Sequence, residues 1–65
     1  MTGRMAEISR ALGSGHYDRA FVLATEFSGR PKLAAAFLLE SGVPLDELPI
    51  GALRAIVAAR EARAA

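Results

Sequence analysis

The sequence of 65 residues contains no cysteine, no tryptophan and a single histidine. Without cysteine the chain has no disulfides, iron–sulfur clusters, thiolate zinc sites or cysteine nucleophiles. The lone histidine, His16, has no dense carboxylate cluster beside it, so we expect a solvated side chain rather than a metal ligand or a catalytic base. The sequence also lacks a phosphate-binding glycine loop and a nucleophile elbow. We therefore expect no enzymatic activity, no cofactor and no small-molecule substrate.

Long hydrophobic runs are absent too. The longest unbroken apolar run, from Leu33 to Leu39, has seven residues, whereas a membrane-spanning helix needs about 20. The first residues hold no apolar stretch of the kind that a signal peptide requires. These features predict a cytoplasmic protein with no membrane segment.

Net charge is nearly absent, because the chain has eight Lys and Arg residues and seven Asp and Glu residues. Nucleic-acid-binding domains usually carry a basic face, and here the arginines are scattered among glutamates, which makes a nucleic-acid partner the less favoured expectation. Seven of the eight basic residues are arginine and 14 residues are alanine. This bias is typical of GC-rich bacterial or phage genomes.

Good helix formers, mainly alanine, leucine, glutamate and arginine, fill the stretches between the glycines and prolines. No segment alternates with a period of two over a useful length, so no strand is expected. The sequence therefore predicts one all-α domain over residues 1–65, a small bundle of three to four helices. The helices are expected at about residues 2–12, 16–27, 31–41 and 49–63, with a single turn at 45–48.

Local signals suggest how these helices begin, end and face the core. Thr2 and Ser14 are the expected N-caps of the first two helices, and Gly42 is the expected left-handed end of the third. The second and third helices are apolar around most of their circumference, which is typical of a central or interfacial helix. The residues expected to face inward on the first helix are Met5, Ile8 and Leu12. The stripe expected to face inward on the second helix is Tyr17, Ala20, Phe21, Ala24 and Phe27. On the last helix it is Ile50, Leu53, Ile56 and Val57.

Gly15, Tyr17 and Ala20 follow the spacing G-x-Y-x-x-A. This spacing resembles the start of the second helix of a tetratricopeptide repeat, over roughly residues 6–42. The resemblance implies that the glycine makes the turn, the tyrosine packs across the hairpin and the alanine permits close helix approach. The aromatic residue expected early in the first helix is missing, and the chain is too short for the three or so repeats of such arrays. A generic αα-hairpin explains the same residues, and we favour it.

A chain this short, without disulfides or a metal, buries little surface when it folds alone. Self-association or binding to a partner would stabilise its folded state. We expect a non-catalytic protein–protein interaction domain, for docking, as an adaptor or for oligomerisation. Its partner would be another protein, a further copy of the chain, or both. The predicted apolar anchors are Phe21, Phe37, Leu38 and Leu39, and the predicted charged rim is Arg54, Arg60 and Glu61.

The alternative is a small helix-turn-helix-like DNA-binding regulator, either a monomer or a dimer. Residues 31–42 and 45–58 would be the two crossing helices of such a motif. Asp46 and Glu47 would then start the recognition helix, although groove-reading positions usually hold Arg, Lys, Asn or Gln. Arg54, Arg60 and Arg63 would supply the phosphate contacts.

Overall fold

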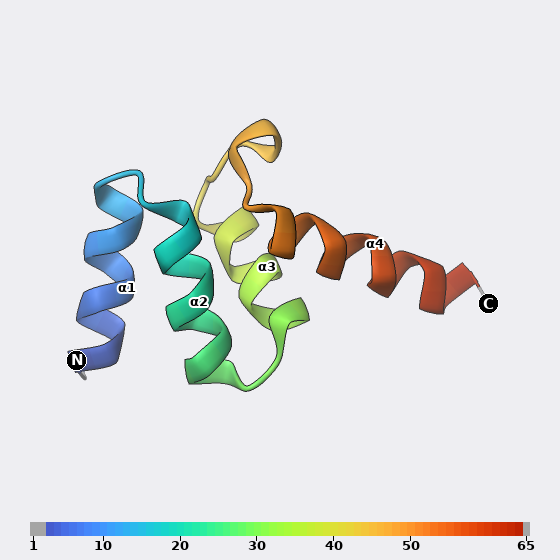
Figure 1. The fold of residues 1–65 in the computed structure, drawn as a ribbon, viewed down its shortest axis with the longest axis horizontal. Helices are drawn as coiled ribbons and strands as arrows, with labels where there is room; N and C mark the ends of the chain where they lie inside the picture. Colours follow the sequence, from blue (N-terminus) through green and yellow to red (C-terminus); the bar gives the residue numbers. More distant parts are fainter. Residues whose placement is uncertain (1–2, 65) are drawn as a thin grey trace.

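The computed structural model describes residues 3–64, which form four α-helices and one short 3₁₀ helix (Figure 1). The elements are α1 (Gly3–Gly13), α2 (Tyr17–Ser28), α3 (Pro31–Glu40), η1 (Leu45–Glu47) and α4 (Ile50–Ala64). The predicted all-α class is confirmed, and every predicted helix end lies within one residue of the observed one. The single turn predicted at residues 45–48 is η1. Thr2, the predicted cap of the first helix, lies outside the described residues.

Glycine ends α1 and α3 through the same backbone motif. At the end of α3, Gly42 has φ 93° and donates its N–H to the Leu39 carbonyl, and the Val43 N–H bonds the Leu38 carbonyl at 3.2 Å. These two bonds define a Schellman motif, which satisfies carbonyls that the helix end leaves free. Gly15, with φ 76°, ends α1 in the same way. Both positions favour glycine because a Cβ is strained at positive φ.

The start of α2 differs from the prediction. Its N-cap is His16, which makes no side-chain cap hydrogen bond, so Ser14 is not the cap. The reason is the turn that precedes the helix, since the Schellman motif uses residues 14–16 and the first helical residue is Tyr17. Ser14 instead donates its backbone N–H to the Arg10 carbonyl at 3.0 Å.

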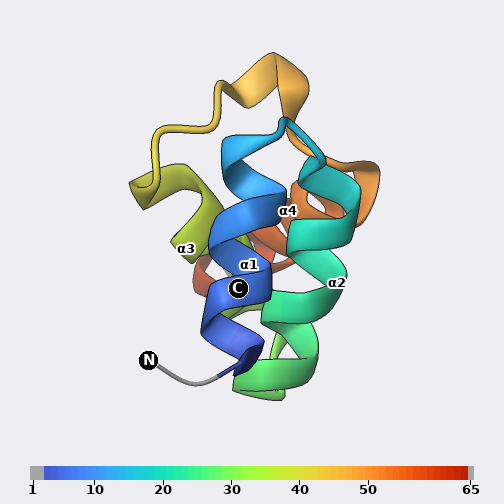
Figure 2. The same cartoon turned by 90° about the vertical axis from the view of Figure 1, so that its left-hand side faces the viewer.

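The helices pack in the order in which they occur along the chain. α1 packs on α2, α2 on α3, and α3 on α4. Figure 1 shows α1 and α2 side by side, with α4 extending away from them toward the C-terminus, and Figure 2 shows α1 and α2 side by side in front of α4. The result is elongated, 38 × 24 × 16 Å, with α3 placed between α2 and α4. This confirms the central position expected for the third helix.

The core is built largely from alanine. Among residues 3–64, six of the eleven buried apolar residues are alanines, and Ala20, Ala35 and Ala52 on α2, α3 and α4 have an exposed fraction of 0%. Small side chains at a helix contact let the two backbones approach closely. Leu38 and Ile8 are the largest side chains that are fully buried. α1, the glycine turn and α2 form an αα-hairpin, the interpretation favoured for the G-x-Y-x-x-A spacing, and Ala20 is buried within it.

The inward face predicted for α4 is wrong at two positions. Ile50 and Val57 are 68% and 54% exposed, whereas Ala52 is fully buried. Leu53 and Ile56 are partly buried against the core as predicted. The helix turns its alanine side toward α3 because close approach to α3 requires small residues, and the two large aliphatic side chains are left on the solvent side.

Gly51 brings the start of α4 close to α2. A Cβ added at Gly51 would lie 2.9 Å from the Cε2 atom of Phe21, so an alanine there would displace the Phe21 ring. Gly13, the last residue of α1, has nothing within 4 Å of such a Cβ. The Phe21 ring of α2 therefore packs directly against the backbone of α4 at Gly51.

We expect Gly51→Ala to be less stable than Gly13→Ala by about 1 kcal/mol, because both gain helix propensity and only the first creates a steric conflict. Thermal unfolding followed by circular dichroism measures the difference. Equal melting temperatures for the two variants would show that the Phe21 ring does not constrain α4.

Candidate interaction site

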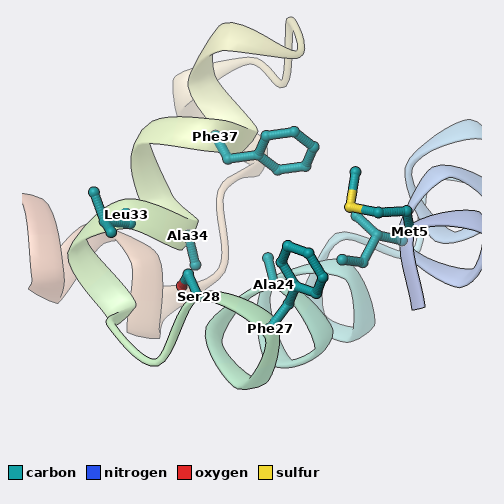
Figure 3. A pocket seen from close by; sticks show the side chains of 8 residues that line it. Met5, Ala24, Phe27, Ser28, Leu33, Ala34 and Phe37 are labelled. Carbon is teal, nitrogen blue, oxygen red and sulfur yellow. The ribbon is translucent and has the colours of Figure 1, made fainter. Parts of the chain in front are cut away.

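An apolar pocket opens between α1, α2 and α3. Its volume is about 150 Å³ and the exposed lining consists of apolar atoms. Figure 3 shows the rings of Phe27 and Phe37 and the side chain of Met5 converging on one space from three different helices. The residues that line it are Met5, Ile8, Ala24, Phe27, Ser28, Leu33, Ala34 and Phe37.

The pocket exists because α1 and α3 both pack along α2. Ala24 and Ala34 are buried at its base, and their small side chains leave the space that larger residues would fill. Phe27 is 56% exposed, although it was predicted to face the core, and Leu33 is 49% exposed at the α3 edge. Large apolar side chains are therefore left in contact with water around the pocket.

An ion pair joins α1 to α2. Arg4 Nη1 lies 2.6 Å from Glu26 Oε1, and these residues directly precede Met5 and Phe27 in the sequence. Both side chains are about half exposed, so the pair contributes at most about 1 kcal/mol to stability. Its effect is to tie the start of α1 to the end of α2.

The predicted apolar anchors are divided between three places. Phe37 lines the pocket, and Phe21 packs between the core and Gly51 of α4. Leu38 is fully buried in the core, so its side chain has no surface for a partner to contact. Leu39 is 40% exposed and lies in a separate groove between α3 and α4.

The predicted rim residues all lie on α4, on two sides of it. Arg60 lines the groove that contains Leu39. Arg54 and Glu61 are exposed and share the solvent face of the helix with Ile50 and Val57. The structure therefore places none of the three at the apolar pocket.

Sequence reasoning did not identify Met5, Phe27 and Leu33 as site residues. The first two belong to stripes expected to be core, and the signal that distinguishes them is position: both lie in the helical turn farthest from the Gly13–His16 connection. The ends of a helical hairpin are the places where a third helix covers the apolar stripe least.

Basic side chains gather where α3 begins and α4 ends. Lys32 and Arg63 line two shallow grooves on either side of the α3–α4 contact, and Arg60 lines one of them. The groove floors are mainly alanine, with Leu39 and Ile56 in one. None of these three basic residues makes an ion pair within residues 3–64.

His16 is exposed at the N-cap of α2. Within residues 3–64, no group of three or more His, Asp or Glu side chains is arranged to hold a metal ion. In the same range, none of the helices combines the length and the apolar character needed to cross a membrane.

A scan of protein-family models, a search of curated proteins and a search of solved structures each gave no match to this chain.

Proposed function

We propose that the chain is a non-catalytic protein–protein interaction domain that receives an apolar side chain of a partner protein in the pocket between α1, α2 and α3. The observation that carries the proposal is the pocket itself, with an apolar lining and the half-exposed Phe27 ring at its edge. An apolar cavity of about 150 Å³ is large enough to hold a group the size of benzene. One aromatic or branched aliphatic side chain from an amphipathic helix meets that requirement.

The energetics favour such a partner. Met5, Phe27, Leu33 and Phe37 expose apolar surface that water solvates poorly, and covering it contributes about 25 cal/mol per Å². A single apolar side chain seated in a pocket is the usual form of an interface hot spot.

Phe27→Gln tests the pocket, and Val22→Gln is its control. The two residues lie on α2 with nearly equal exposure, 56% and 55%, and only Phe27 lines the pocket. In affinity capture from the cells that make the protein, we expect a partner retained by the original chain and by Val22→Gln. Phe27→Gln should retain about tenfold less of it, as hot-spot truncation does. The proposal is contradicted if Phe27→Gln captures the same proteins in the same amounts as the original chain, or if the original chain captures no protein.

DNA binding is the second candidate, and the observation that favours it is the gathering of Lys32, Arg60 and Arg63 beside α4. The connection between α3 and α4 takes residues 41–49 and includes η1, whereas a helix-turn-helix has a turn of about three or four residues. A basic surface that binds phosphates loses affinity steeply with salt. A titration of duplex DNA at low and high salt separates this candidate from the first.

A further inference from the structure

The solvent face of α4 carries an alternating row of apolar and charged residues, Ile50, Arg54, Val57 and Glu61, which we term the α4 stripe. All four are exposed, and Ile50 and Val57 are 68% and 54% exposed. Their spacing of four, three and four residues places them on one side of a helix. The row therefore presents two large aliphatic side chains on one side of α4, which is a surface that a second helix could cover.

Neither charge of the α4 stripe has an ion-pair partner among residues 3–64. Arg54 and Glu61 are seven residues apart, two helical turns or about 10.5 Å along the axis, which is too far for a direct pair on one helix. Neither side chain makes an ion pair with any other residue in the described part of the chain. The two opposite charges therefore flank Val57 on either side without neutralising one another.

This arrangement is complementary to itself. If a second copy of α4 lies antiparallel on the first, with a two-fold axis between Val57 and Ala58, Arg54 of each copy lies opposite Glu61 of the other. The two Val57 side chains then meet at the axis, and the small, exposed Ala58 permits close approach of the helices. A two-fold contact uses the same patch on both copies, and such dimers are the commonest protein oligomers.

The surface area of the chain is consistent with a second copy. The chain exposes 4523 Å², whereas a compact monomer of 6.8 kDa is expected to expose roughly 3950 Å². The excess of about 570 Å² per chain accompanies the extension of α4 away from the other helices (Figure 1). A contact that covered an equal area on each of two copies would bury about 1100 Å², which is at the lower end of specific interfaces and typical of a weak dimer.

We propose that the chain forms a two-fold dimer through antiparallel packing of the α4 stripe on that of a second copy, with two Arg54–Glu61 ion pairs between the copies. This inference does not depend on the partner proposed above, because the pocket lies on α1, α2 and α3. A dimer of this kind presents two pockets, which raises the avidity for a partner with two binding segments.

A charge-swap series tests the dimer. Sedimentation equilibrium over a range of protein concentrations should show a species of twice 6.8 kDa for the original chain. Arg54→Glu and Glu61→Arg should each weaken dimerisation by about tenfold or more, because each change places like charges opposite one another at two symmetric positions. The double variant Arg54→Glu/Glu61→Arg should restore dimerisation, because the ion pairs form again with reversed sign.

Arg10→Glu is the matched control for Arg54→Glu, since it makes the same change of net charge at an exposed position of α1. It should leave the dissociation constant of the dimer unchanged, and circular dichroism checks that every variant keeps its helix content. A chain that stays monomeric at millimolar concentration overturns the proposal. So does a double variant that dimerises no better than the single ones. Loss of the dimer leaves the Phe27 capture test unaffected, so the two proposals fail separately.

Discussion

Leu38→Ala is expected to lower the free energy of unfolding by about 3 kcal/mol. Leu38 is fully buried and belongs to the cluster that joins α3 to the connection and to α4, together with Val43, Leu48 and Ala52. Removing three of its carbon atoms leaves a cavity that rigid neighbouring helices fill only partly. A chain of this length has roughly 3 to 10 kcal/mol of stability in total, so the variant should be unfolded to a measurable extent at room temperature.

Urea unfolding followed by far-ultraviolet circular dichroism measures this loss, and it suits a chain without tryptophan. Leu39→Ala is the control, because Leu39 follows directly on the same helix and is 40% exposed. We expect a loss of about 1 kcal/mol for Leu39→Ala. Similar losses for both variants would mean that Leu38 is not at the centre of the core.

Ala35→Leu is expected to cost about 3 kcal/mol by the opposite mechanism, overpacking. Ala35 is fully buried and shares its cluster with Ala20 of α2 and Ala52 of α4, which are also fully buried. A leucine at this position needs room that three helices in close contact do not provide. The bundle must then separate α3 from a neighbour or force the new side chain out of its preferred rotamers.

The adjacent Ala36→Leu is the matched control for the overpacked variant. Ala36 is exposed and lines the groove between α3 and α4 that also contains Leu39 and Ile56. The same change there should alter stability by no more than about 0.5 kcal/mol. Denaturant midpoints of the two variants give the comparison, and an Ala35→Leu variant as stable as Ala36→Leu would contradict close packing of the alanines.

Helix boundaries were predictable because they depend on local chemistry. Pro31 begins α3, and the helix stops before Gly42, whose positive φ is a property of a few consecutive residues. The cap of α2 was the exception. There the glycine turn of the preceding helix extends to His16 and displaces Ser14 from the helix start, so two local signals competed for the same residues.

The inward face of α4 was not predictable from hydrophobicity alone. Ile50 and Val57 are more apolar than Ala52, and a pattern based on large side chains selects the wrong side of the helix. What decides the orientation is the distance between helix axes, which the small residues at the contact set and which depends on the whole fold. The alanine content of the sequence indicated close packing without showing where it occurs.

The candidate pocket was predictable only in part. Phe37 was expected as an anchor and does line it, whereas Met5 and Phe27 were assigned to the core by their helical spacing. Spacing identifies the apolar side of each helix. It does not show where α3 stops covering the stripe of the hairpin, because that depends on the angle at which α3 crosses α2.

The order of helix packing has a consequence for how the chain folds. Each main helix contact joins neighbours in the sequence, α1 with α2, α2 with α3 and α3 with α4. Only short loops need closing, so the chain entropy lost before each contact forms is small. Chains with such low contact order fold on the order of microseconds to milliseconds. During synthesis the α1–α2 hairpin is complete before α4 has been made, and α4 then docks mainly on α3, with Gly51 against the Phe21 ring of α2.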